Sequence, residues 1–376
     1  MNIAIIGGGA SGVMLAHLLE KETNVTIFEK NSSLLHKVKM TGNGKGNVSN
    51  LNMDKSYYNN PTFVNNIINL LDINKLSDSL SCLLKNDEMG RIYPYFEKSN
   101  IIIDGLTLYN TNIKLNYEVK NISKKDNHYL IDGEEFDIVV IATGSDAPNK
   151  IINKNNCELI KKLGHNITYL YPSLSPIHIK DNLRIISGKR VKGSISLKYK
   201  DETYTHQGEI LFKDDSLSGI CVFELSSIYA RNKVKNIDMK DAYLEVDLFP
   251  NIEEKELFSI LLKRYKTNRE PLKGLFDEGF VKFISLKVDI KNINKLTNYL
   301  KHMKFNINLD KQPDIYQVIS GGVNINEINN DLSSKLNENL YFIGEVLDID
   351  GMCGGYNLHF AFSSAYKVYL KLKGRL

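Results

Sequence analysis

The chain has 376 residues, of which 42% are hydrophobic and 24% are charged, and its formal net charge is +4. This is the composition of an ordinary globular protein, and the chain is long enough for two or three domains that fold without disulfide bonds. The lysines are spread among many asparagines, which is typical of a solvated surface and argues against a nucleic-acid or membrane patch.

Cysteines and apolar segments restrict the class of protein further. The cysteines at 82, 157, 221 and 353 are far apart, form no CxxC pair and have no histidines at metal-ligand spacing. No segment reaches the roughly 18 to 20 apolar residues that span a bilayer, and three consecutive glycines interrupt the apolar N-terminus. We therefore expect a reduced, cytoplasmic protein with no metal site and no membrane contact.

The N-terminal residues have the pattern of a βαβ unit. Residues 2–6 form a short apolar run typical of a buried parallel strand, residues 10–20 have helical spacing, and residues 24–29 form a second strand. A later run, FDIVVIATG at 136–144, predicts another buried strand that ends in a glycine turn. The fold class we predict is α/β, with a Rossmann-like domain of the glutathione-reductase type.

The middle of the chain has a different pattern. Alternating segments between about 166 and 250 predict an antiparallel sheet with no long helix between its strands, and residues 253–308 have helical spacing. Strand-like runs at 315–323 and 340–346 then lead to a final helix that begins near Asn357. We expect a Rossmann-like domain from 1–165 and 331–376, an inserted antiparallel domain from 166–252 and 309–330, and a helical insertion at 253–308.

The first glycine cluster has the spacing of a dinucleotide-binding turn. Gly7, Gly9 and Gly12 fit GxGxxG between a strand and a helix, which allows a tight turn, close approach of a pyrophosphate and close helix packing. Glu29 ends the second strand, where its carboxylate would bind ribose hydroxyls and repel a 2′-phosphate. This predicts a site for the ADP part of FAD or NAD; the alternative is a glycine turn with a structural role alone.

A second glycine- and asparagine-rich loop at 35–50 favours FAD over NAD, because a larger ligand needs to be wrapped. Lys37 and Lys45 can neutralise a pyrophosphate or a reduced flavin, and Gly42 and Gly44 permit close backbone approach. The strand and turn at 136–144 suit the same cofactor. The alternative is a flexible surface loop with incidental lysines.

Several motifs together resemble the BaiN-like family of FAD-dependent oxidoreductases. They are GGGASG at 7–12, KVKMTGNGKGNVSN at 37–50, GRIYP at 90–94, GEILF at 208–212, LSG at 217–219, SGGV at 320–323 and GEVLDIDGMCGGYN at 344–357. The resemblance covers nearly the whole chain and implies noncovalent FAD, a discontinuous FAD domain, an inserted β-barrel-like domain and a helical insertion. It also implies NAD(P)H-linked reduction of conjugated double bonds, or an amine-oxidase activity.

The chain departs from this family pattern in two places. Lys45 and Gly46 stand where the family usually has arginine and cysteine, so a role that needs a guanidinium or a thiol is in doubt. After IATG, the family's glycine-rich stretch is replaced by SDAPNKIINKNNCELIKKLGH. We expect a changed site wall near Ser145 to Asn156.

The glycines before the final helix suggest the redox end of the cofactor. A helix N-terminus after Gly354 and Gly355 would stabilise negative charge on a reduced flavin, with the glycines leaving room for its ring. Glu345 would bind the ribityl chain. The alternative is a plain docking helix after a glycine turn.

The residues that we expect at the cofactor are Gly7, Gly9, Ala10, Ser11, Gly12, Glu29, Lys30, Lys37, Thr41, Gly42, Gly44, Asn47, Val119, Thr143, Gly144, Gly344, Glu345, Gly354, Gly355, Tyr356 and Asn357. Lys30 can equally be a solvated neighbour of Glu29. The catalytic residues stay unknown: Tyr356 and Arg91 are weak candidates, and His359 and Cys353 are others. Each has a structural alternative, such as packing or pairing with a carboxylate.

The leading hypothesis is an oxidoreductase that passes a hydride from NAD(P)H through FAD to an activated C=C or similar small organic acceptor. An FAD-dependent oxidase that uses oxygen is the first alternative. The second is a flavin-containing binding or RNA-associated protein. Nucleic acid is not the expected partner, and the oligomeric state stays open.

Overall fold

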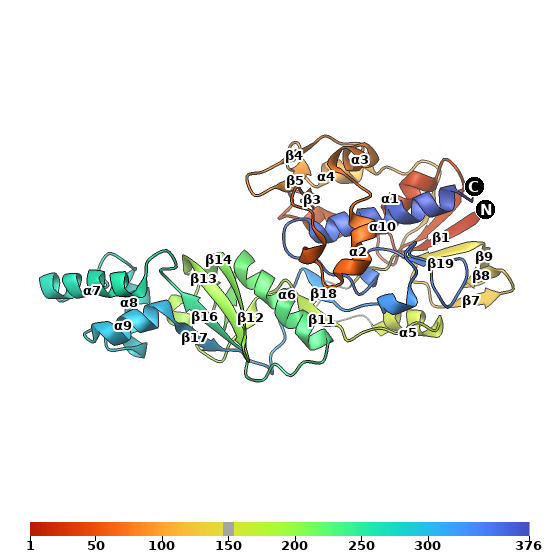
Figure 1. Cartoon of the computed structure of the whole chain (residues 1–376). Helices are drawn as coiled ribbons and strands as arrows, with labels where there is room; N and C mark the ends of the chain where they lie inside the picture. Colours follow the sequence, from red (N-terminus) through yellow and green to blue (C-terminus); the bar gives the residue numbers. More distant parts are fainter. Residues whose placement is uncertain (146–153, 376) are drawn as a thin grey trace. The chain divides into compact units, whose positions relative to one another are not determined.

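The computed structural model describes residues 1–145 and 154–375, which form two compact units (Figure 1). The first unit contains Met1–Tyr171 and Val318–Leu376, and the second contains Pro172–Gln317. Residues 318–330, which the sequence analysis grouped with the inserted domain, therefore lie in the first unit. The crossings between the units are next to the short strands β11 (Tyr171–Ser173) and β18 (Val318–Ser320).

A parallel sheet forms the centre of the first unit. Its strand order is β19 (Leu340–Phe342), β10 (Ile138–Ile141), β1 (Asn2–Ile6), β2 (Asn24–Phe28) and β6 (Asn112–Lys114). Every neighbouring pair is parallel, and β10 and β19 are buried along their whole length. The predicted Rossmann-like sheet is confirmed, and the carboxyl ends of β1, β10 and β19 meet at one edge.

Helices and small sheets surround this sheet. Helices α1 (Ala10–Leu19) and α10 (Tyr356–Lys373), from opposite ends of the chain, pack side by side (Figure 1). The other helices are α2 (Pro61–Ile68), α3 (Ile73–Ser79), α4 (Asn100–Gly105) and α5 (Lys154–Lys162), with short turns η1 (Val38–Met40), η2 (Lys55–Tyr57), η4 (Ile325–Glu327) and η5 (Gly344–Val346). The antiparallel strands are β3 (Ser49–Asn50), β4 (Leu84–Asn86), β5 (Arg91–Pro94), β7 (Ile122–Lys125), β8 (His128–Ile131) and β9 (Glu134–Phe136).

An antiparallel sheet forms the second unit, as predicted. Its strand order is β12 (Ile177–His178), β15 (Ser216–Ser218), β14 (Glu202–Phe212), β13 (Arg190–Tyr199), β16 (Tyr243–Asp247) and β17 (Met303–Asn306). The helices α7 (Glu254–Asn268), α8 (Glu278–Lys287) and α9 (Ile293–Lys301) gather at one end of this unit, and η3 (Arg184–Ile186) contacts α8 (Figure 1).

Two expectations for the second unit are wrong. The 15-residue helix α6 (Ile220–Val234) lies between strands β15 and β16, where no long helix was expected. Its buried side includes Ser226 and Ser227, and such small polar residues hide the apolar period that would identify a helix. The helical segment also ends at Lys301 rather than near 308, because β17 pairs with β16.

Among the helices of the described residues, none is both long and apolar enough to cross a membrane.

Candidate cofactor site

The three motif glycines in the turn between β1 and α1 have different surroundings. Gly7 has a φ of +113°, and a Cβ there would run into the carbonyl of Ala142 at the end of β10. A Cβ on Gly12 would overlap the carbonyl oxygen of Gly7. Among the described residues, apart from the chain neighbours of Gly9, no atom lies within 4 Å of a Cβ position on this glycine. The turn is therefore closed by protein at Gly7 and Gly12 and open at Gly9, which is the position where a pyrophosphate would approach.

The start of α1 joins the two ends of the chain. Gly9 is the N-cap and makes no side-chain cap, so the first N–H groups of the helix are available for an anion. Ser11, in this first turn, packs against Gly344: a Cβ on that glycine would lie 2.5 Å from Ser11 Oγ. Ser364 Oγ in α10 accepts a hydrogen bond from the Gly344 N–H at 2.9 Å. Residues from both predicted glycine segments thus meet at one place.

Glu29 lies directly beside this turn. Only 7% of the residue is exposed, and its Oε2 accepts a hydrogen bond from the Gly8 N–H at 2.7 Å. Its Oε1 accepts from the Asn31 backbone N–H at 2.8 Å and from the Asn31 side chain at 2.6 Å. These hydrogen bonds fix the carboxylate of Glu29 at the edge of the open turn.

Two further predicted cofactor residues lie near this strand. Lys30 is exposed, and Val119, after β6, is half-buried against the core.

A small, partly open pocket lies at the carboxyl ends of β10 and β19. Thr143, Gly144 and Glu345, all predicted cofactor residues, line it together with the glycine pair at 321–322. The buried hydroxyl oxygen of Thr143 has no hydrogen-bond partner among the described residues. A buried hydroxyl that lacks a partner in the protein suits a site that a polar ligand completes.

Lys37 links the second glycine loop to this pocket. Its ammonium group donates to the backbone carbonyl of Ser145, to Ser145 Oγ at 3.1 Å and to Glu345 Oε2 at 3.2 Å. The other oxygen of Glu345 accepts a hydrogen bond from the Ile319 N–H at 3.3 Å. The structure therefore brings together Lys37 and Glu345, which are 308 positions apart.

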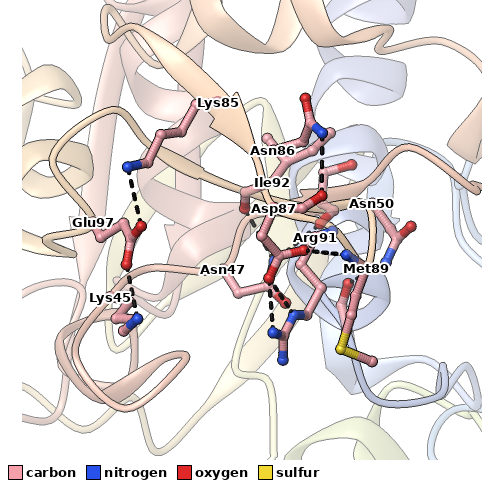
Figure 2. A network of polar contacts seen from close by, with 12 residues as sticks. Lys45, Asn47, Asn50, Lys85, Asn86, Asp87, Met89, Arg91, Ile92 and Glu97 are labelled. Atoms are coloured by element: carbon pink, nitrogen blue, oxygen red, sulfur yellow. Dashed lines mark hydrogen bonds and ion pairs between the residues drawn. The ribbon is translucent and has the colours of Figure 1, made fainter.

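The second loop contains an ion-pair cluster that the sequence analysis did not predict. Lys45 forms an ion pair with Glu97 at 2.8 Å, and Glu97 also pairs with Lys85 at 3.0 Å (Figure 2). These two ammonium groups lower the pKa of Glu97 to about 2. Lys45 therefore has a carboxylate partner within the protein, and its expected role beside a pyrophosphate stays a prediction.

The remaining predicted residues of the second loop have separate surroundings. Thr41 Oγ1 donates to the carbonyl of Lys37 at 3.2 Å. Gly42 has a φ of +58° and packs on Asn47, whose amide donates to the carbonyls of Ser49 and Ile92, both at 3.0 Å. Gly44 has open space around a Cβ position. Of the loop glycines, Gly44 is thus the position that leaves room for a ligand.

The glycines before α10 are needed for packing within the chain. Gly355 has a φ of +99°, and a Cβ there would run into the backbone carbonyl of Ser49 in β3. The Asn357 side chain accepts from the Gly351 N–H and donates to the Gly351 carbonyl, both at 2.8 Å. The expectation that Gly355 leaves room for the flavin ring is wrong on its Cβ side, since strand β3 fills that space.

The weak catalytic candidates have structural partners. Tyr356 is buried, stacks on Tyr57 with ring centres 4.6 Å apart and donates its hydroxyl to the Asn52 carbonyl at 3.4 Å. Arg91 pairs with Asp87 at 2.7 Å (Figure 2). Cys353 is half-buried. For Tyr356 and Arg91 the geometry favours packing or charge pairing over catalysis.

His359 has its two ring nitrogens engaged inside the first unit. Nδ1 is 2.8 Å from Ser49 Oγ, and Nε2 is 2.8 Å from the carbonyl of Ile68, to which it donates. Burial lowers the pKa of the imidazole, so the ring is neutral and accepts from the serine hydroxyl. His359 therefore joins β3, α2 and α10.

Sequence reasoning missed Asp348, a buried acid at the edge of the pocket. Its carboxylate accepts hydrogen bonds from Asn59 at 2.9 Å and from Thr168 Oγ1 at 3.0 Å, and burial raises its pKa. A Cβ on the pocket residue Gly322 would lie 2.7 Å from the Asp348 nitrogen. The signal available in the sequence was an acid inside the glycine-rich motif at 344–357.

The expected change of the site wall at Ser145 to Asn156 falls largely outside the described residues.

Comparisons with known proteins give the family. The model of the HI0933-like protein Rossmann domain matches residues 1–369. A 3-dehydro-bile acid delta(4,6)-reductase of Clostridium scindens is 27% identical, over 97% of this chain and 97% of its own. A ribosomal RNA dihydrouridine synthase of Haemophilus influenzae is 25% identical, over 98% and 97%.

Among solved structures, a 3-ketosteroid-delta4-(5alpha)-dehydrogenase of Rhodococcus jostii aligns with a TM-score of 0.46 and 12% identity, over 98% of this chain and 95% of its own. The family match spans nearly the whole chain and confirms the resemblance to BaiN-like proteins. The protein belongs to the HI0933-like family of FAD-dependent Rossmann-fold oxidoreductases.

Proposed function

We propose that the protein binds FAD noncovalently and reduces a carbon–carbon double bond conjugated to a carbonyl group, with NAD(P)H as the reductant. The names of two full-length relatives support this reaction class. One is a delta(4,6)-reductase of a 3-dehydro-bile acid, and the other makes dihydrouridine in ribosomal RNA.

The two named reactions share one chemistry. A 3-oxo group conjugated to a ring double bond and the C5=C6 bond of uracil beside its C4 carbonyl are both electron-poor alkenes. A hydride adds to the carbon remote from the carbonyl, electron density moves to the carbonyl oxygen, and a proton then adds to the adjacent carbon. FAD, when bound, supplies the hydride that NAD(P)H has delivered.

The open position at Gly9 is the observation that carries the cofactor assignment. Here the chain leaves space above a helix N-terminus, and Glu29 is fixed beside it with a carboxylate suited to ribose hydroxyls. Thr143 adds a hydroxyl without a protein partner among the described residues. Lys37 and Glu345 hold each other at the pocket and supply a cation and a carboxylate for polar groups of the cofactor.

An absorbance spectrum of the purified protein, followed by anaerobic titration with NADH and NADPH in turn, tests the proposal. We expect flavin bands that bleach with one of the two donors and recover when an acceptor is added. The acceptors to compare are a 3-oxo-4,6-diene steroid and a uridine-containing RNA. Fast recovery with oxygen alone would indicate an oxidase, and failure to bind FAD even after its addition would overturn the cofactor assignment.

A further inference from the structure

Two aromatic side chains next to the second glycine loop are exposed to solvent. Tyr95 is 54% exposed and Phe96 is 74% exposed, and their rings meet edge to face with centres 5.5 Å apart. Hydrogen bonds fix the backbone on both sides, since the Tyr95 N–H donates to the Leu83 carbonyl at 2.9 Å and the Glu97 N–H to the Pro94 carbonyl at 2.8 Å. The rings are thus presented by a fixed backbone.

A lysine and a paired carboxylate lie beside this aromatic pair. The ammonium group of Lys85 lies 5.6 Å from the centre of the Tyr95 ring and pairs with Glu97, which also holds Lys45 (Figure 2). Lys98, the next residue, is exposed. Glu97, with a pKa of about 2, is ionised at neutral pH and fixes two lysines beside the rings. Two ammonium groups therefore share one carboxylate, and a third lysine follows it in the chain.

This surface borders the loop that we expect to hold the cofactor. The Ser99 N–H donates to the carbonyl of Gly44 at 2.9 Å, and Ser99 Oγ donates to the carbonyl of Lys39 at 2.9 Å. Gly44 itself has open space around a Cβ position. A long ligand that lies on the aromatic pair can therefore extend to the 41–47 loop.

We propose that the stacking surface, formed by Lys45, Lys85, Tyr95, Phe96 and Lys98, docks an unpaired segment of RNA next to the cofactor loop. Flat exposed rings suit base stacking, and ammonium groups beside them suit backbone phosphates. A steroid would match the rings but has no row of phosphates for the ammonium groups beside them. This inference rests on the proposed function, because RNA bound here would present a uracil to the same reductive site.

Fluorescence anisotropy with a labelled 12-nucleotide oligouridine and the FAD-loaded full chain tests the docking. The double variant Tyr95→Ala/Phe96→Ala should raise the Kd by about tenfold or more, because alanine cannot stack on bases. Tyr109→Ala is the matched control, since this 80% exposed aromatic lies beside Glu20 rather than among the lysines, and it should bind RNA as the wild type does.

Charge changes give a second readout. Glu97→Gln removes the carboxylate that pairs with Lys45 and Lys85, so RNA affinity should rise and its salt dependence should steepen. Lys98→Gln should weaken binding and lower the slope of log K against log salt by about 0.7, the value for one phosphate contact on a single strand. Circular dichroism and the flavin spectrum check that each variant is folded.

The outcomes separate this inference from the proposed function. RNA binding that is absent, or that is equal in the double variant and the wild type, overturns the docking surface. Binding to anionic lipid vesicles in place of RNA, lost in the same double variant, also overturns it. Anaerobic flavin reduction and steroid reduction by the wild type test the proposed function without RNA, so either idea can fail alone.

Discussion

Gly9 and Gly12 are residues of one type, three positions apart, whose surroundings differ completely. Gly12 has no room for a Cβ because the Gly7 carbonyl fills the space, whereas the part of the chain that the structure describes leaves the space around a Cβ on Gly9 open. The φ of Gly9 is −80°, which any residue adopts. The fold therefore requires a glycine at position 12 but not at position 9, where the proposed cofactor would need one.

This contrast predicts different effects of the same substitution. Gly9→Ala should leave the free energy of unfolding of the apoprotein unchanged and weaken FAD binding by about tenfold or more, since the methyl group occupies the approach to the turn. Gly12→Ala should lower the free energy of unfolding by about 1–3 kcal/mol through overpacking. Urea unfolding of the apoprotein and fluorescence titration with FAD measure the two effects. Wild-type FAD affinity in Gly9→Ala would contradict the assignment of the turn.

His359 predicts a pH dependence of stability. Burial lowers the pKa of the ring in the folded protein, so below the ordinary histidine pKa of about 6.5 the unfolded chain binds a proton that the native state does not. The free energy of unfolding should therefore fall as the pH drops below about 6.5. His359→Gln should lack this contribution and be less stable by about 1–3 kcal/mol at neutral pH, because buried hydrogen bonds are lost. Denaturant unfolding between pH 5 and 8 gives the comparison, and equal pH slopes would contradict it.

At the scale of elements, the start of α10 depends on a distant strand. Gly355 sits against the Ser49 backbone, and Asn357 holds the turn at Gly351 through two hydrogen bonds. His359 adds a contact from α10 to both β3 and α2. The glycine motif before this helix therefore has a packing role within the first unit.

Gly355→Ala and Gly354→Ala separate backbone strain from steric overlap. Both glycines have positive φ, so alanine costs about 1–2 kcal/mol of strain at either position. Only Gly355 also faces a backbone carbonyl, whereas Gly354 faces the Asn50 amide at 3.3 Å and the Tyr356 ring at 3.4 Å. Gly355→Ala should be the less stable variant by about 1–3 kcal/mol, measured by urea unfolding. Equal losses in the two variants would mean that strain alone decides.

At the scale of the whole molecule, the candidate site is assembled from segments far apart in the chain. The parallel order β19-β10-β1-β2 places the turn after β1, the turn after β10 and the segment after β19 at one edge. In α/β sheets, ligands bind at this carboxyl edge, where the strand order reverses. Cofactor binding should therefore protect several segments of the first unit together.

Hydrogen–deuterium exchange with and without FAD measures this protection. Amide exchange should slow around residues 7–12, 37–47, 143–145 and 344–346 and stay unchanged in α7, α8 and α9. FAD at 100 times its Kd should raise the free energy of unfolding by about 2.7 kcal/mol, because it binds the folded state alone. Protection restricted to residues 7–12 would show that the other segments do not contact the cofactor.

Local patterns predicted much of the first unit. The βαβ unit at the N-terminus, the buried strand β10 and the final helix follow from apolar runs and helical spacing, since each element buries one face of its own sequence. Helix α6 was missed because serines interrupt its buried face. Strand β17 was assigned to a helical segment because four residues are too few to show a period.

The sequence by itself determined the α/β class, the glycine turn after β1 and the family, because these depend on local spacing and on motifs in chain order. Only the tertiary structure decided the partners of individual side chains: Lys45 pairs with Glu97, and Gly355 packs against Ser49. It also brought Lys45 and Lys85, 40 positions apart in the chain, to the same carboxylate beside two exposed aromatics. Such contacts arise from residues that the fold brings together over long sequence distances, and no local period records them.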